Sequence, residues 1–465
     1  EDKTIVQNKW VFCVKKASSG VRYKARLVAK GFTQQYGIDY LETFSPVVRN
    51  ATIRILFSMA VNLNLLIYHL DVETAFLNGN IDQQIYMAQP EGFVCKKDPN
   101  KVCLLKKAIY GLKQSSRIWN LKVEKVLVKM NFKQSAYEPC IFFKIVDSSI
   151  VIIALYVDDF LICSSSSSLK EDVKQDLSKE FKLKDLGLIN HFLGLNVDCK
   201  ISNVIRVNQK DYILELLKKF HLTDAKPVNT PIEIGLRLKP NHNEKPNVPY
   251  QNLIGSLMYL AVHTRPDIAY SISYLSQFNS TFDMEHWKHA KRVLKYLKGS
   301  MHKSLVFCKS NKPITGYVDA DFSNDVNDRK SYTGYVFKWA NAAVSWESKK
   351  QSCVALSSTE AEYIAMTEAV KEAVFIKGLI GEILTVEKPF IIYNDSQSAQ
   401  KLIKNPVYHS RTKHIDTKYH YIREIINKGI VKVDYVPTDK MIADVLTKGL
   451  PSDKHRLCIE QFNLN

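Results

Sequence analysis

The sequence predicts a multidomain protein of mixed α/β and α+β class. Its 465 residues exceed one ordinary domain and suit roughly two to four. Hydrophobic residues make up 46% of the chain, so each domain can bury a core. Strand-like and helix-like segments alternate toward both ends of the chain, and the region between them is mostly helical.

In the first region, a buried strand leads directly into two acids. Residues Ile150–Val157 are all apolar, as in a strand buried on both faces, and Asp158 and Asp159 follow. A second strand-like run, Leu65–Leu70, ends at Asp71. Adjacent carboxylates repel each other unless a counter-charge is near, and Mg²⁺ prefers carboxylate oxygens. The pattern predicts a divalent-metal site; the alternative is an Asp-rich turn.

The middle of the chain contains a proline-rich connector and lysine-rich helices. Five prolines fall within residues 227–249, and prolines at that density exclude helices and central strands. The remaining segments of residues 206–311 are helical and rich in lysine, as in Lys210–His221 and His286–Lys298. We expect an irregular connector followed by a helical, basic region.

In the last region, acids again follow strand-like segments. One strand-like run ends at Asp319, and two more strands are expected before a long helix. A later run, Phe390–Tyr393, leads to Asp395, and Asp444 lies in a segment further on. Any single one of these acids is more often a plain surface residue, so the prediction of a site depends on the group.

The long helix offers two glutamates. Ser357 is followed by Glu360 three residues later, which is the spacing of a capping box. Capping occupies Glu360 at the helix start and leaves Glu362, two residues further along, available for chemistry.

The charge and cysteine content limit the class of partner. There are 65 Lys and Arg against 47 Asp and Glu, a net charge of +18, which favours a polyanion such as nucleic acid over a merely basic surface. The longest apolar run has eight residues, far short of the about 20 that span a bilayer, so we expect no membrane contact. The nine cysteines contain no CxxC pair and predict reduced, intracellular thiols. His286 and His289 are expected on a helix surface.

Five phrases of the sequence resemble one family. Leu70–Gly79 and Tyr156–Asp159 resemble motifs A and C of reverse transcriptases. Tyr23–Gly31, Glu42–Val47 and Tyr110–Gln114 resemble copia-type elements. Over residues 1 to about 460, the chain is therefore similar to the reverse transcriptase and ribonuclease H region of a copia-type LTR-retrotransposon (Pseudoviridae) Pol polyprotein.

The resemblance implies a right-hand polymerase with fingers, palm and thumb, followed by a ribonuclease H-like domain. The implied boundaries are 1–205 for fingers and palm, 206–311 for thumb and connection, 312–450 for the ribonuclease H-like domain and 451–465 for a C-terminal tail.

The resemblance also implies residues for the polymerase site. Two Mg²⁺ ions, with Mn²⁺ as a substitute, would be held by Asp71, Asp158 and Asp159. Phe76 stands where the family has an aromatic gate against the ribose 2′-OH, and plain core packing is its alternative. The other implied nucleotide-binding residues are Lys24, Arg26, Gly111 and Gln114.

A second pair of ions is implied in the ribonuclease H-like domain. The quartet of acids that would hold them is Asp319, Glu362, Asp395 and Asp444. The stretch His409–Asp416 is similar to a copia-type hallmark, and its His and basic residues suggest phosphate contact, although a helix surface without ligand fits nearly as well.

The implied activity is RNA-directed and DNA-directed DNA synthesis with degradation of RNA in an RNA–DNA hybrid. The implied partners are an RNA template, a DNA primer, the hybrid and deoxynucleoside triphosphates, without a membrane. A homodimer or association with other Pol products, within a cytoplasmic virus-like particle or the nucleus, follows by analogy.

Two departures from the family pattern favour an alternative. Ser116 stands where the family usually has proline, and family members normally carry more fingers sequence before a segment such as Asn8–Phe12. The alternative is a truncated or domesticated relic that binds nucleic acid without catalysis. An integrase or protease fragment ranks last, because no HHCC zinc pattern or Asp-Thr/Ser-Gly motif is present.

Overall fold

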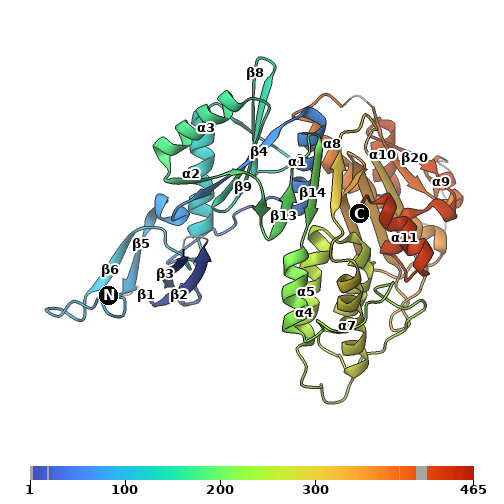
Figure 1. The fold of residues 1–465 in the computed structure, drawn as a ribbon, viewed down its shortest axis with the longest axis horizontal. Helices are drawn as coiled ribbons and strands as arrows, with labels where there is room; N and C mark the ends of the chain where they lie inside the picture. The colour runs from blue at the N-terminus through green and yellow to red at the C-terminus, as the bar shows by residue number, and fades with distance from the viewer. Residues whose placement is uncertain (1–3, 18–19, 387, 405–415) are drawn as a thin grey trace. The chain divides into compact units, whose positions relative to one another are not determined.

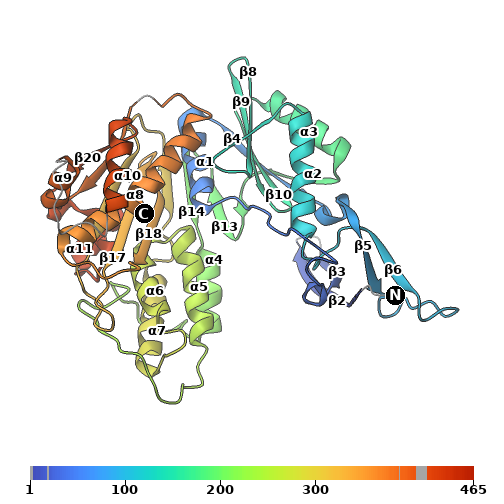
Figure 2. The same cartoon turned by 180° about the vertical axis from the view of Figure 1, so that it is seen from behind.

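The computed structural model describes residues 4–17, 20–386, 388–404 and 416–465, and its chain forms two compact units (Figures 1 and 2). Unit 1 contains Glu1–Val48 and Leu66–Leu188. Unit 2 contains Arg49–Leu65 and Ile189–Asn465. The boundaries implied at residues 205, 311 and 450 stay a prediction.

Unit 1 is built on a six-stranded sheet in the order β11-β4-β10-β9-β8-β7. Its central strands bury apolar residues such as Leu70, Leu155 and Phe160 almost completely, as the apolar runs predicted. The strands are β4 (Leu66–Val72), β7 (Lys133–Gln134), β8 (Ile141–Val146), β9 (Ser149–Tyr156), β10 (Asp159–Ser164) and β11 (Leu183–Leu188).

A hairpin, a three-stranded sheet and two helices complete unit 1. The hairpin pairs β2 with β3, and the second sheet has the order β1-β5-β6. The strands are β1 (Ile5–Val6), β2 (Asn8–Ala17), β3 (Gly20–Ala29), β5 (Asn80–Ala88) and β6 (Val102–Lys107). The helices are α2 (Ser115–Lys129) and α3 (Ser167–Glu180), with short 3₁₀ turns η1 (Gly31–Thr33) and η2 (Ala75–Asn78).

Unit 2 begins with a four-stranded sheet, β12-β13-β14-β15, and a set of helices. Residues 220–249, all described, contain no helix or strand, which confirms the irregular connector. The strands are β12 (His191–Phe192), β13 (Leu195–Asp198), β14 (Val204–Asn208) and β15 (Leu305–Cys308). The helices are α1 (Asn50–Leu63), α4 (Lys210–Lys219), α5 (Tyr250–His263), η3 (Pro266–Ile268), α6 (Ala269–Ser276) and α7 (Met284–Gly299).

The rest of unit 2 is a five-stranded mixed sheet in the order β18-β17-β16-β19-β20. Three antiparallel strands, a long helix, a parallel strand and further helices follow one another, the order expected of a ribonuclease H-like domain. The strands are β16 (Thr315–Ala320), β17 (Tyr332–Trp339), β18 (Ala342–Lys350), β19 (Phe390–Asn394) and β20 (Val431–Tyr435). The helices are α8 (Ser358–Gly381), α9 (Gln397–Lys404), α10 (Asp416–Asn427), η5 (Thr438–Lys440), η6 (Ile442–Leu446) and α11 (Ser452–Gln461).

Helix α1 belongs to unit 2 although its sequence lies between segments of unit 1. It packs against β14, β15 and β18. Arg54 on this helix is buried; its Nε donates to Val344 O at 2.7 Å, its Nη1 donates to Val262 O at 2.8 Å, and its guanidinium stacks on Trp346 at 3.8 Å. These contacts join α1 to the five-stranded sheet.

Two other features differ from the sequence expectations. His286 and His289 are 1% and 3% exposed, so their expected place on a helix surface is wrong. His286 Nδ1 lies 2.7 Å from Asp283 Oδ1 in the cap of α7, and apolar neighbours cover the ring. The expected C-terminal tail contains helix α11, and Phe462 after it is fully buried.

Among the residues that the structure describes, there is no disulfide bond and no helix that could span a membrane. All nine cysteines lie among these residues and are free thiols. None of the described helices combines the length and apolar character that a membrane span requires.

Two candidate catalytic sites

The first site lies where β4 and β10 pair in unit 1. Asp71 and Asp159 are directly opposite each other in the antiparallel register. Asp158 occupies the turn between β9 and β10, and its carbonyl accepts a 2.8 Å hydrogen bond from Val72 N. Because strand pairing positions all three backbones, the predicted acids of the first region meet at one edge of the sheet.

The turn that carries Asp158 is strained. Val157 has φ of 54°, in the left-handed region that a β-branched residue rarely adopts. The indole Nε1 of Trp119 on α2 donates to Val157 O at 2.6 Å, which holds the turn in place. Trp119 is itself 1% exposed. The surrounding structure thus maintains a conformation that presents Asp158.

Burial and repulsion by a neighbouring carboxylate outweigh the nearby charges of Lys24 and Lys184 at Asp71. Burial raises the pKa of Asp71, and the neighbouring Asp159 charge raises it further. Burial also raises the pKa of Asp158, with a further contribution from Asp159. His69 Nε2 lies 2.6 Å from Asp159 Oδ1. Carboxylates held together in this way fit a divalent cation, which favours their charged forms.

A cavity of about 590 Å³ opens beside these acids within unit 1. Lys24 and Arg26 on β3 contribute to its lining, as do Asp71 and Asp158. The ring of Phe76 forms part of the wall and packs on Tyr110 with centroids 4.7 Å apart. The structure thus brings three of the five expected nucleotide-binding residues to the cavity.

The other two expected nucleotide-binding residues, Gly111 and Gln114, are not among the described residues that line the cavity. Gly111 has φ of 93°, and a Cβ there would lie 2.0 Å from Ala29 O, so the backbone requires glycine. Gln114 is buried and donates to Asp39 O at 2.9 Å while accepting from Gln34 Nε2 at 3.1 Å. Gly111 thus packs against the end of β3, and Gln114 joins the start of α2 to the segment of Gln34 and Asp39.

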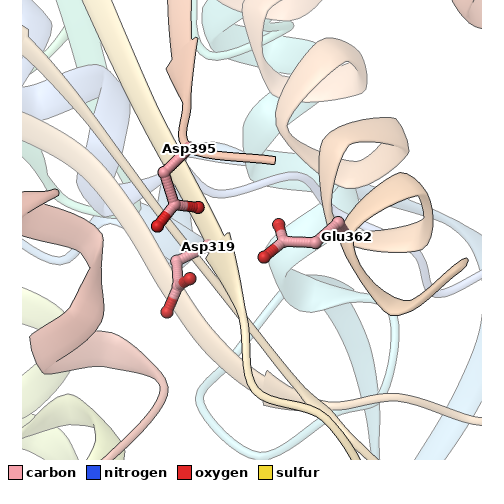
Figure 3. A group of neighbouring side chains, drawn as sticks. All are labelled: Asp319, Glu362 and Asp395. Atoms are coloured by element: carbon pink, nitrogen blue, oxygen red, sulfur yellow. The ribbon is translucent and has the colours of Figure 1, made fainter. Parts of the chain in front are cut away.

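The second site lies at the ends of β16 and β19 in unit 2. These two strands are parallel neighbours, so Asp319 in β16 and Asp395 after β19 lie at the same edge of the sheet. Glu362 comes from the first turns of α8, which packs on β16. The three carboxylates point toward one another (Figure 3), with one oxygen of each within 4.8 Å of the others.

The structure brings Glu362 rather than Glu360 to the acids. Ser357 Oγ accepts from Glu360 N at 3.2 Å, and Glu360 Oε2 accepts from Leu356 N at 2.8 Å. Glu360 is therefore engaged at the start of α8, as the capping argument predicted. Glu362, one half-turn further, is 8% exposed and faces Asp319.

Asn394 orders the second site and escaped the sequence analysis. Its Nδ2 donates to Glu362 Oε2 at 3.0 Å and to Val318 O at 3.2 Å, and the residue is fully buried. Thr438 Oγ1 holds the other side of the group by donating to Asp395 Oδ2 at 2.7 Å. The only sequence signal for Asn394 is its place next to Asp395 at the end of a strand.

Asp444 lies beside this group but outside it. It is 4% exposed, and its Oδ1 lies 2.8 Å from Lys448 Nζ. Thr447 Oγ1 donates to Asp319 Oδ2, so the segment of Asp444 also contacts Asp319. The structure thus assembles three of the four predicted acids within 4.8 Å and places the fourth against a lysine.

The charges at the second site fit a divalent cation. Burial raises the pKa of Glu362 well above its usual value, and Asp319 and Asp395 raise it further. Burial also raises the pKa of Asp319, against the opposing effect of Lys448. Oxygen ligands gathered in a buried, negatively charged group match the preference of Mg²⁺ and Mn²⁺.

Residues 409–415 of the stretch suggested for phosphate contact lie outside the described residues.

Together the two units define a right-hand polymerase fold followed by a ribonuclease H-like domain, as expected. The family model described as "Reverse transcriptase (RNA-dependent DNA polymerase)" matches residues 1–234, about half of the chain. The chain belongs to this family of reverse transcriptases.

Relatives extend the similarity to the whole chain and confirm the copia-type resemblance. The "Retrovirus-related Pol polyprotein from transposon TNT 1-94" of Nicotiana tabacum is 44% identical over 98% of this chain and 35% of its own length. The corresponding polyprotein from transposon RE1 of Arabidopsis thaliana is 40% identical over 96% of this chain and 31% of its own length. The chain thus spans about a third of the length of each of these two polyproteins.

A solved structure of a foamy viral protease-reverse transcriptase in complex with dsDNA aligns with 94% of this chain and 78% of its own chain. The TM-score is 0.48 and the identity is 14%.

Proposed function

We propose that this chain copies RNA and DNA templates into DNA and cleaves the RNA strand of RNA–DNA hybrids, each by two-metal phosphoryl transfer. The observation that carries the proposal is the meeting of acids from distant segments at two separate sheet edges, one beside a cavity with basic walls. The partners would be an RNA template, a DNA primer, their hybrid and deoxynucleoside triphosphates.

At the polymerase site, Asp71, Asp158 and Asp159 would hold two Mg²⁺ ions. When bound, such ions lower the pKa of the attacking 3′ hydroxyl and stabilise the leaving pyrophosphate. Lys24 and Arg26, which line the same cavity, would bind the triphosphate by charge. The Phe76 ring, braced by Tyr110, would occupy the space of a 2′ hydroxyl and select deoxynucleotides.

At the nuclease site, Asp319, Glu362, Asp395 and Asp444 would hold the ions that activate water against an RNA phosphate. Asn394 fixes Glu362, and Thr438 fixes Asp395, so both carboxylates are oriented before a ligand arrives. The basic helices of residues 206–299 would contact the phosphate backbone of the hybrid. We also propose that the chain forms a homodimer or associates with other Pol products.

Two assays on two variants test both activities. Primer extension on an RNA template with Mg²⁺ should be abolished by Asp158→Asn and retained by Asp395→Asn. Cleavage of a labelled RNA–DNA hybrid should show the reverse pattern, so each variant is the folding control for the other. If the wild-type chain binds hybrid but performs neither reaction, the chain is the nucleic-acid-binding relic and the proposal fails.

A further inference from the structure

A lysine lies among the acids of the nuclease site. Lys448 Nζ is 2.8 Å from Asp444 Oδ1 and 3.4 Å from Asp319 Oδ2. The side chains of the two acids are only 5% and 3% exposed, whereas that of Lys448 is 37% exposed. One ammonium group, reachable from solvent, is therefore shared by two buried carboxylates that come from different segments.

The backbone dictates where this lysine lies. After η6 the chain turns back on itself, because Lys448 N and Thr447 N both donate to Asp444 O, at 3.1 and 3.2 Å. The turn packs directly on β17, where a Cβ on Gly334 would come within 2.8 Å of Leu446 Cβ and 2.7 Å of Thr447 Cγ2. This packing fixes the backbone at Leu446 and Thr447, and the next residue places its Nζ near both Asp444 and Asp319.

The four acids consequently form two cation positions that share Asp319. One position is the group of Asp319, Glu362 and Asp395, whose oxygens lie within 4.8 Å of one another. The other lies between Asp319 and Asp444, where Lys448 is found. Asp444 Oδ1 accepts no directed hydrogen bond from any described residue, so the ion pair with Lys448 is its contact there.

The electrostatics agree with a lysine that acts as a counter-ion. Burial alone would lower the pKa of Lys448, but the charges of Asp319 and Asp444 raise it above its usual value. In turn, Lys448 opposes the rise that burial causes in the pKa of Asp319. The two acids thus favour the charged form of Lys448, and Lys448 favours the charged form of Asp319, as a metal ion at that position would.

We propose that the Lys448 ammonium fills the cation position between Asp319 and Asp444, and that a divalent ion enters this position only by displacing it. The inference rests on the proposed nuclease function and deepens it. In the free protein, the group of Asp319, Glu362 and Asp395 binds the first ion, and Lys448 keeps the affinity for the second ion low. A phosphate that arrives with the hybrid offers the displaced ammonium a new partner.

Manganese binding to the full chain tests this proposal without relying on activity. All variants carry Asp71→Asn and Asp158→Asn, which removes metal binding at the polymerase acids. Titration calorimetry and the electron paramagnetic resonance signal of free Mn²⁺ then count the ions bound at the nuclease site. Lys448→Met is compared with Lys432→Met, which removes a lysine paired at 2.8 Å with Asp434 on the surface of the same sheet.

The parent and Lys432→Met should bind one Mn²⁺ ion tightly and a second weakly. Lys448→Met should bind the second ion roughly tenfold more tightly, because the ammonium that contacts both carboxylates is gone and, among the described residues, only Lys454, 3.6 Å from Asp444 Oδ2, still competes. Lys448→Arg should restore weak binding. Lys448→Gln, which keeps a hydrogen-bond donor beside Asp444 without the charge, should behave like Lys448→Met and provides the result if the methionine variant does not fold.

The outcomes separate this proposal from the nuclease function. One outcome would refute the role of Lys448 and leave the metal site intact. In that outcome, Asp395→Asn abolishes binding of the first ion, but Lys448→Met and Lys448→Gln bind the second ion no more tightly than Lys432→Met does. If none of the variants binds Mn²⁺ at this site, the metal-dependent nuclease function is refuted together with the lysine proposal.

Discussion

The two candidate sites assemble the same chemical groups in different surroundings. Two acids of the polymerase site, Asp71 and Asp158, line a cavity of about 590 Å³, and the Asp159 side chain is 25% exposed. The acids of the nuclease site are buried, apart from Asp395, which is partly exposed. In the first site, Lys24 and Arg26 on β3 supply positive charge. In the second site, Lys448 supplies it from the same short segment as Asp444.

The difference reflects what each site must admit. A nucleotide triphosphate requires space, and a cavity with basic walls supplies space and charge together. A phosphate of a nucleic-acid backbone can bind at the protein surface without a deep cavity. The acids of the nuclease site can therefore be buried and held by hydrogen bonds from Asn394 and Thr438.

Burial at the nuclease site should produce a distinctive pH dependence of stability. Burial raises the pKa of Asp321, two residues after Asp319, to about 7. The folded carboxyl group keeps a proton that the unfolded one releases above about pH 4, so Asp321 should weaken folding as the pH rises from about 4 to about 7. The unfolding free energy of wild type minus Asp321→Asn should fall by up to about 4 kcal/mol across that range.

Urea unfolding at several pH values in EDTA measures this difference. Asp328→Asn is the matched control, because its carboxylate pairs with Lys350 and its pKa is lowered, so it titrates below the range. A curve for Asp321→Asn as flat as that for Asp328→Asn would show that the nuclease site does not hold its acids in a costly, buried state.

In the polymerase site, Phe76→Ala should relax sugar selection. Removing the ring opens space beside Tyr110, so incorporation of ribonucleotides relative to deoxynucleotides should rise on the order of 100-fold. The ratio of kcat/KM values for the two substrates is the measurement, since it cancels any loss of folded protein. Leu77→Ala, the next residue of the same cavity wall, should leave the ratio unchanged. An equal change in both variants would assign Phe76 to core packing.

His69 should act on the metal requirement of the polymerase site alone. It lies 2.6 Å from Asp159 and fixes the orientation of that carboxylate. His69→Ala should raise the Mg²⁺ concentration at half-maximal primer extension by about tenfold and leave hybrid cleavage unaffected. His69→Gln, which keeps a donor, should recover most of the loss. An unchanged Mg²⁺ requirement in His69→Ala would show that His69 has no role in metal binding at the polymerase site.

The smallest effect concerns the strained turn. Val157→Gly removes the cost of a left-handed valine, so the unfolding free energy should rise by about 1 kcal/mol after the added flexibility of glycine is subtracted. Primer extension should slow, because Asp158 is then less firmly presented. Thermal unfolding and primer-extension rates, measured on the same samples of wild type and Val157→Gly, test both expectations. Faster extension by the more stable variant would contradict the idea that strain serves the site.

Much of both sites could be predicted because the signals are local. Apolar runs that lead to Asp71 and Asp158 indicate buried strands whose ends carry acids, and the strand-like run before Asp319 indicates a third such strand. The choice of Glu362 over Glu360 likewise depends on a cap within one helical turn. The roles of these acids as metal ligands stay a prediction.

Contacts between distant segments were decided only by the tertiary structure. The approach of His69 to Asp159 depends on the register of β4 and β10, and that of Lys448 to Asp319 depends on how one turn packs on β17. The inward position of His289 and the membership of α1 in unit 2 also follow from packing. The sequence indicated several strands that lead to acids and a long helix capped at Glu360, because these signals are local. Their partners were set by burial and strand register, because these depend on the whole fold rather than on neighbours along the chain.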